Sequence, residues 1–345
     1  MEKNKSNKKA IIIGVSQLLL VFILLFITSC GDGGETHTID LDFHKGTKGV
    51  EFDVLGVMGE IYEDTAFKII INVFNNGAYD LPEANGGYVN LNLEEDYMCL
   101  SDGQNCLTTQ NAGAAIKPLG YLKGKSIFNP SGDFEILKYY VHVKDIDKQS
   151  FQHTSNVGIS LCYQYQTDLI TDICIDPYFY EQSTIEKPCV VKDLTFSGQG
   201  APLVVTKIEN KMLSDGKDSV RPMFIIHVSK TGDGEIINKE MVNKVCTADP
   251  LGPNAFNVVH LRELEFMVGN TLYKHDINNE NSNLKCNFLN KKSETKLNQG
   301  KAKIKCTAIK PINKDSGTFS TQLKMIFDYG YTYSKSKSVV IKRLY

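Results

Sequence analysis

Nine cysteines are the residues of this 345-residue chain with the clearest capacity for covalent chemistry. Apart from Cys30, they form an even set: Cys99, Cys106, Cys162, Cys174, Cys189, Cys246, Cys286 and Cys306. No two of them have the C-x2-C spacing of a zinc site, and no histidine lies at ligand spacing from a cysteine pair. We therefore predict disulfide bonds and no metal site. The alternative is that several cysteines are free thiols buried in the core.

Local spacing favours particular disulfide pairs. Cys99–Cys106, Cys162–Cys174 and Cys286–Cys306 would each close a short loop or hairpin, where partner strands bring the Cβ atoms close together. Elimination then leaves Cys189–Cys246. Each bridge is expected to contribute about 2–4 kcal/mol to stability.

The other residue types that carry catalysis lie outside recognisable motifs. The seven histidines fit no catalytic pattern, and no serine has the G-x-S-x-G setting of a nucleophile elbow. Glu94-Glu95-Asp96 offers the paired acids that glycoside hydrolysis uses, but a solvated acidic loop is the simpler interpretation. The acidic turns do not fit the EF-hand pattern of a calcium site. We predict no enzyme activity and no cofactor.

The N-terminus determines where the rest of the chain resides. Met1–Lys9 carries four lysines and leads directly into the apolar stretch Ala10–Thr28. This order is typical of an export segment, whose positive end stays in the cytoplasm while the following chain moves outward. As a helix the apolar stretch would be about 28 Å long, so an uncleaved signal anchor is the alternative to a cleaved signal peptide.

Ile27-Thr28-Ser29-Cys30 resembles the lipobox of bacterial-type lipoproteins, in which small residues precede a lipidated cysteine. The resemblance implies that residues 1–29 form the signal peptide and that Cys30 is lipidated and becomes the mature N-terminus. Residues 30–48 begin with a polar, glycine-rich run and are expected to form a flexible tether. Residues 31–345 would then lie on the extracytoplasmic side of the cell membrane.

Strand patterns fill the remainder of the chain. Short apolar or alternating runs, such as Phe134–Val143, are separated by Gly, Asn, Asp, Ser and Pro, and long helical patterns are hard to find. Proline and glycine interrupt the pattern between Asp176 and Pro202, which suggests a domain boundary. We expect an all-β protein with two tandem immunoglobulin-like β-sandwich domains, residues 49–186 and 187–345.

An internal repeat supports two similar halves. Ile69–Gly77 parallels Phe224–Gly232 at an offset of 155 residues. Leu161–Tyr165 parallels Phe327–Tyr331 at an offset of 166 residues. We expect each of these later segments to form a closing hairpin with the strand that follows it, Ile173–Ile175 in the first half and Val339–Ile341 in the second.

The charge of the body argues against nucleic acid as a partner. Residues 1–29 contain four lysines and one glutamate, so the remaining chain has 34 basic and 39 acidic residues and a net charge of −5. A protein of this balance has no overall electrostatic attraction for a phosphate backbone.

The strand and Asn-Asn-Gly turn at Val73–Gly77 resemble extracellular immunoglobulin-like modules of the CARDB kind, which occur in archaeal and bacterial surface proteins. The resemblance implies a β-sandwich used for adhesion, spacing or assembly, and it transfers no ligand-binding residue. We expect a non-catalytic, membrane-anchored envelope protein whose partner is another cell-surface protein. The alternative is a surface solute-binding lipoprotein or extracellular enzyme with a site between the two domains.

Intact mass spectrometry of protein extracted from membranes tests the N-terminal prediction. We expect a chain that begins at Cys30, carries acyl groups, and has lost the hydrogens of eight oxidised thiols. A mass equal to the full-length chain without acyl groups would identify an uncleaved anchor instead.

Overall fold

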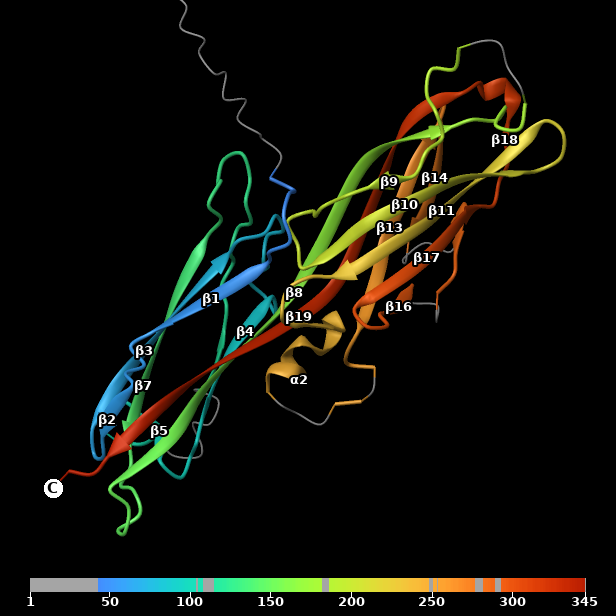
Figure 1. Ribbon diagram of the computed structural model, residues 1–345. Helices are drawn as coiled ribbons and strands as arrows, with labels where there is room; N and C mark the ends of the chain where they lie inside the picture. The colour runs from blue at the N-terminus through green and yellow to red at the C-terminus, as the bar shows by residue number, and fades with distance from the viewer. Residues whose placement is uncertain are drawn as a thin grey trace, which may run out of the picture. The chain divides into compact units, whose positions relative to one another are not determined.

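The computed structural model describes residues 43–103, 105–107, 115–181, 186–247, 251–252, 254–276, 282–288 and 293–344 (Figure 1). The predicted signal peptide at 1–29, Cys30 and most of the predicted tether lie outside these residues, so export and lipidation stay predictions. Within the described residues, no helix has the length and apolar character needed to cross a membrane.

The described chain is all-β, as the sequence predicts, and its strands form three sheets. The first cover sheet contains, in spatial order, β1 (Val50–Leu55), β3 (Ala66–Asn75), β7 (Phe134–Val143) and β5 (Met98–Leu100). The second cover sheet contains β15 (Leu284–Cys286), β17 (Lys301–Ala308), β11 (Ser219–Lys230), β10 (Leu203–Ser214) and β9 (Leu194–Thr195), with β18 (Ile312–Asn313) beside β11.

The shared sheet is the largest of the three. Its spatial order is β14 (Thr271–Asp276), β13 (Val258–Val268), β19 (Phe319–Lys342), β8 (Gln152–Ile175), β4 (Gly87–Leu93) and β6 (Ile116–Pro118). Three short strands join it at the sides, namely β2 (Glu60–Tyr62) and β12 (Glu235–Ile237) next to β19, and β16 (Glu294–Lys296) next to β13. The described helices are single turns: η2 (Lys239–Met241), α2 (Val242–Cys246) and η3 (Lys314–Ser316).

Two long strands form the centre of the shared sheet. β8 and β19 each have 24 residues and pair antiparallel over their whole length, as Figure 1 shows. The prediction of two closing hairpins is therefore wrong. The residues expected to turn, Gln166–Asp172 and Thr332–Ser338, instead continue as strand, because each pairs with the other long strand along its whole length.

The internal repeat has a structural counterpart. Its first feature lies in β3 and β11, and each of these strands has a neighbour on both sides within its own cover sheet. Its second feature lies in β8 and β19, which are flanked by β4 and β13 respectively. Gln164 of β8 pairs with Gly330 of β19, 166 residues later, so the two halves meet antiparallel at equivalent positions.

The predicted boundary between residues 186 and 187 does not separate the two sandwiches, because β8 and β19 contribute to both. Tyr163 of β8 accepts a hydrogen bond from the Val50 N–H of β1, 3.1 Å away, in the first cover sheet. Four residues later, Thr167 donates its hydroxyl to the Leu203 carbonyl of β10, 2.7 Å away, in the second cover sheet. Both cover sheets thus pack on one face of the shared sheet, and residues 42–345 form one unit.

Buried tyrosines lie beneath the junction of the two cover sheets. Tyr163, Tyr165, Tyr329 and Tyr331 come from adjacent positions of β8 and β19, and each is at most 5% exposed. Their hydroxyls accept or donate hydrogen bonds at the ends of the covering strands: Tyr165 donates to Asn75 Oδ1 (3.0 Å), and Tyr329 and Tyr331 accept from Leu203 N (3.3 Å) and Gly234 N (2.9 Å). Buried polar groups at this junction are therefore paired.

The described end of the predicted tether packs against the body. The Gly200 N–H donates to the Gly46 carbonyl at 2.8 Å, and the Thr231 hydroxyl lies 3.3 Å from the Thr47 carbonyl. Gly200 has φ of +68°, a conformation that glycine adopts without strain. Residues 46–48 are thus part of the junction between the cover sheets rather than of a free linker.

Four disulfides join the eight cysteines of the body. Cys99–Cys106 and Cys286–Cys306 are the pairs expected from local spacing. The predicted pairs Cys162–Cys174 and Cys189–Cys246 are wrong, because Cys162 bonds to Cys246 and Cys174 to Cys189. The error follows from the missing hairpin: Cys162 and Cys174 lie twelve positions apart on one extended strand. The Cys162–Cys246 bridge instead fastens α2 to the outer face of the shared sheet.

Removing one buried hydroxyl tests the role of the tyrosines. We expect Tyr163→Phe to lower the free energy of unfolding by about 1–3 kcal/mol, because the Val50 N–H loses its partner inside the protein. Urea unfolding followed by circular dichroism measures the change. The control Tyr140→Phe removes a hydroxyl from a 45% exposed ring and should change stability by less than about 0.5 kcal/mol.

Alkaline pH provides a second test. Burial raises the pKa values of Tyr163, Tyr165 and Tyr329 above the ordinary value of 10.0. A raised pKa in the folded state contributes stability that is complete below pH 10 and is lost as the pH rises above it, since the unfolded chain ionises first. We expect the melting temperature to fall above pH 10 and tyrosinate absorbance from these residues to appear with unfolding. Their titration near pH 10 in the folded protein would contradict this account.

Candidate functional site

Of the acids that the sequence offers for catalysis, Glu94 makes structural contacts through its side chain. Glu94 accepts a hydrogen bond from the Ser155 hydroxyl at 2.7 Å and lies 3.5 Å from His153 Nε2. The Ser155 hydroxyl lowers the pKa of Glu94, so this side chain is held as a carboxylate and does not store a proton for acid catalysis. Glu95 takes part through its backbone carbonyl, which accepts from Lys144 Nζ at 2.6 Å.

The histidines of the described residues are dispersed. His142 lies 3.6 Å from Asp64, His227 contacts Glu209 at 2.8 Å, and His275 contacts the Ser293 hydroxyl at 2.9 Å, each in a different region of the sheets. Within the ranges that the structure describes, no group of three or more histidine, cysteine or acidic side chains could hold a metal ion.

A polar hollow of about 290 Å³ lies near the middle of β8 and is lined by His44, Asp80 and Asp168 among others. Asp80 is already engaged, because its carboxylate accepts from the Tyr121 hydroxyl at 2.6 Å and from the Gly124 N–H at 2.8 Å. Burial raises the pKa of Asp168. The contacts of Asp80 hold the 120–124 segment in place, which gives this hollow a structural role.

The edge of β1 is closed to a partner strand. Its outward Phe52 N–H and carbonyl face the Tyr333 hydroxyl at 3.4 Å and 3.3 Å. Lys335 and Lys337, from β19, donate to the carbonyls of Phe52 (2.5 Å) and Val54 (3.2 Å). These side chains thus hydrogen-bond to backbone groups that an added strand would need. Inward-pointing lysines are a known way to prevent strand addition at a sheet edge.

The outer face of the first cover sheet carries exposed apolar side chains among polar ones. We define the apolar face as six outward residues of β1, β3 and β7: Leu55, Ile70, Phe74, Phe134, Ile136 and Tyr140. The other outward positions include Glu51, Asp53, Lys68, Asn72, Lys138 and His142. Cross-strand register places Phe74 opposite Phe134, with ring centroids 6.3 Å apart, and Leu55 opposite Ile70. Phe134 is 63% exposed and Ile136 is 49% exposed. Exposed aromatic and aliphatic side chains gathered on one sheet face form a candidate interaction surface.

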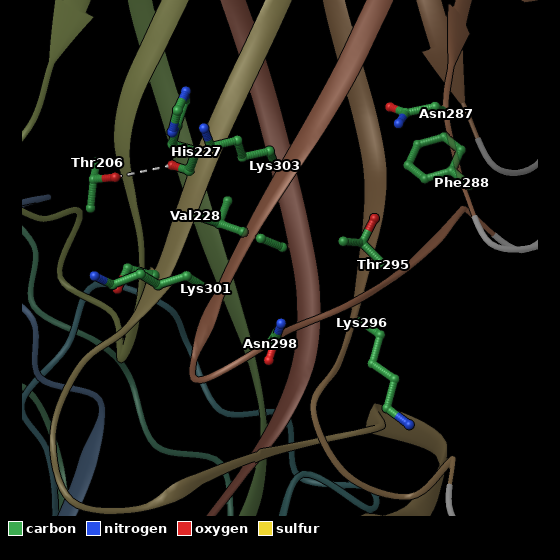
Figure 2. Close-up of a pocket in the computed structure, with 12 residues that line it drawn as sticks. Thr206, His227, Val228, Asn287, Phe288, Thr295, Lys296, Asn298, Lys301 and Lys303 are labelled. Atoms are coloured by element: carbon green, nitrogen blue, oxygen red, sulfur yellow. Dashed lines mark hydrogen bonds between the residues drawn. The ribbon is translucent and has the colours of Figure 1, made fainter.

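A second candidate surface lies on the second cover sheet. A hollow of about 870 Å³, the lysine hollow, borders β17 (Figure 2). Its lining comes from β10, β11, β16, β17 and the residues after β15: Thr206, His227, Val228, Ser229, Asn287, Phe288, Thr295, Lys296, Asn298, Lys301, Ala302 and Lys303. Figure 2 shows His227 and Lys303, which are cross-strand partners, on the side of β17 away from Asn287 and Phe288. No acidic residue occurs among these described lining residues.

The alternation of β17 explains why its lysines reach solvent. Ile304 and Cys306 are fully buried beneath the sheet, so Lys301, Lys303 and Lys305 point outward and are exposed. On β10, which is separated from β17 by β11, two lysines have an acidic partner, because Lys207 and Lys211 contact Asp193 at 2.9 Å and 3.0 Å. These contacts lower the pKa of Asp193. No carboxylate of the described chain pairs with the three β17 lysines.

Sequence reasoning missed both surfaces, although each has a signal. In Phe134–Val143, apolar residues occur at both odd and even positions, which a strand with one solvated face does not need. In Lys301–Lys305, three lysines alternate with alanine and isoleucine, which places all three charges on one face of a strand.

The chain matches no protein-family model and no curated protein. Among solved structures, it is similar to the C-terminal domain of the AgI/II polypeptide BspA of Streptococcus agalactiae, with 9% identity over 85% of this chain and 98% of that one and a TM-score of 0.14. A structure titled BspA_C_mut gives 10% identity, coverage of 86% and 99%, and a TM-score of 0.15. TM-scores of this size are far below those of chains that share a fold.

Proposed function

We propose that this chain is a non-catalytic, membrane-anchored protein of the cell envelope that binds another surface protein through its apolar face. The observation that carries the proposal is the exposure of Phe134, Ile136 and Tyr140 on the outward face of β7, where Lys138 lies between the last two. Burying a large apolar side chain stabilises a complex by roughly 1.5–3 kcal/mol, so several such residues can support a specific contact.

The composition of the apolar face suits a protein partner. Aromatic residues dominate the energetics of protein interfaces, and here Phe74, Phe134 and Tyr140 supply three rings. Lys68, Asn72 and Lys138 lie among them on the same outward positions and can form the polar part of the contact. Because these residues lie on paired strands, their positions are set before binding and little side-chain ordering is required.

Membrane attachment through Cys30 would support such a role. Confinement of the chain near other envelope proteins raises its effective concentration, so a modest intrinsic affinity is sufficient. The four disulfides support an oxidising location outside the cytoplasm, where such bonds persist.

The alternative of an enzyme or solute receptor with a site between two domains finds less support. The hollow near Asp168 is small and its Asp80 carboxylate is committed to structural contacts. The larger lysine hollow belongs to the second cover sheet and its surroundings, and its lining contains no pair of acids for catalysis.

Cross-linking on intact cells tests the proposal. A photo-reactive residue at position 136 should capture a defined surface protein. Phe134→Asp in the same chain should reduce the yield at least tenfold, about 1.4 kcal/mol in binding, because a charge would be buried in the contact.

Ile170 of β8 is 61% exposed outside the apolar face and provides the control. A photo-reactive residue at 170 should not capture that protein, and Ile170→Asp should leave capture at 136 unchanged. Equal capture from both positions, or no effect of Phe134→Asp in a folded variant, would refute the role of this face.

A further inference from the structure

The three lysines of β17 form a row of positive charge with no carboxylate partner in the part of the chain that the structure describes. The body as a whole carries a net charge of −5, yet Lys301, Lys303 and Lys305 are exposed on one strand face and have no carboxylate partner in the described chain. On β10 of the same sheet, by contrast, Lys207 and Lys211 each contact the carboxylate of Asp193. The ammonium groups of Lys301, Lys303 and Lys305 are therefore available to bind an external anion.

The row borders a concave surface. Lys301 and Lys303 line the lysine hollow together with Lys296, and its neutral polar lining includes Asn298. The hydroxyls of Thr206 and Ser229 also line it, and each donates to a backbone carbonyl 3.3 Å away. Ammonium, hydroxyl and amide groups are the donors that phosphate oxygens accept from. Glu209 lies on the same sheet face, but its carboxylate is held by His227 at 2.8 Å.

The spacing of the lysines indicates a ligand with repeated charges. Alternate residues of a strand are about 6.6–6.8 Å apart, so the row from Lys301 to Lys305 is about 13 Å long. A single small anion could contact one or two of these ammonium groups. A chain that carries phosphate at regular intervals could contact all three while lying along β17, and each additional contact would occur at high effective concentration.

We propose that the lysine hollow and the β17 row bind a phosphate-bearing polymer in extended form. The concave shape distinguishes this ligand from a flat bilayer, and the described lining offers one large apolar side chain, Phe288, which is partly buried against the core. This site is separate from the apolar face, so the chain would contact a protein with one cover sheet and a polyanion with the other.

Binding of long-chain inorganic polyphosphate tests this proposal. The full-length chain is held in nanodiscs of neutral phosphatidylcholine, and its affinity for polyphosphate is measured over a series of salt concentrations. We expect binding that weakens with salt, because released counterions contribute to the affinity. The double variant K301E/K303E should bind at least tenfold more weakly and show a smaller salt dependence.

A matched charge change provides the control. Lys123 and Lys244 are exposed lysines outside the second cover sheet, so K123E/K244E alters the net charge equally without touching β17. This variant should stay within twofold of the natural chain. Thermal melting of both variants verifies that they are folded, which is expected because all four side chains are exposed.

Four outcomes would overturn the proposal. The first is that the natural chain does not bind polyphosphate, and the second is that the two double variants lose equal polyphosphate affinity. The third is an affinity for orthophosphate equal to that for polyphosphate per phosphate group. The fourth is stronger binding to discs or vesicles that contain phosphatidylglycerol than to polyphosphate. None of these outcomes bears on protein capture at position 136, so the two functional proposals succeed or fail separately.

Discussion

The continuous pairing of β8 with β19 is the interaction on which the remaining structure depends. These strands form 24 consecutive residue pairs, and each strand supports a part of both cover sheets. The flanking strands β4 and β13 add to this central pair, and the cover sheets pack on one of its faces. Because residues along a strand alternate between the faces, one long ladder can present a continuous apolar surface to two sheets side by side.

At the junction between the cover sheets, tyrosine side chains form hydrogen bonds with backbone groups at the ends of the covering strands. Where a covering strand begins or ends, its backbone N–H groups would lack partners in the interior. Tyrosine hydroxyls from β8 and β19 supply those partners, and the hydroxyls of Tyr163 and Tyr165 closely approach Gly49 and Gly77. This close approach leaves no room for a larger residue at either glycine.

Much of the strand content could be predicted from the sequence, while the way the halves interlock could not. Alternating runs identify β3, β7 and β11, and the short loop closed by Cys99 and Cys106 follows from spacing. The continuation of β8 past Tyr165 was missed because apolar segments on both sides of a polar stretch fit a hairpin and a long strand equally well. That single ambiguity led to the wrong partners for Cys162 and Cys174.

The candidate surfaces were harder to predict for a different reason. A strand with apolar residues on both faces could be covered on both faces. Phe134 and Ile136 therefore indicate a binding surface only once the structure shows that they are exposed. The lysines of β17 resemble any solvated charge run until their neighbours are known. Their distinction is that no carboxylate of the described chain pairs with them, which depends on strands far apart in sequence.

The interlocked strands also determine the order in which the protein can mature. Residues 329–342 complete the first sandwich, yet they are among the last to be made, so that sandwich cannot close while the chain is still emerging. Contacts of this sequence separation form slowly, and until they form, β8 presents a long unpaired edge. Cys99–Cys106 and Cys174–Cys189 join residues only 7 and 15 positions apart and can oxidise early, whereas Cys162 must wait for Cys246, 84 residues later. Premature oxidation of Cys162 with a nearer thiol is therefore the characteristic misfolding hazard of this topology.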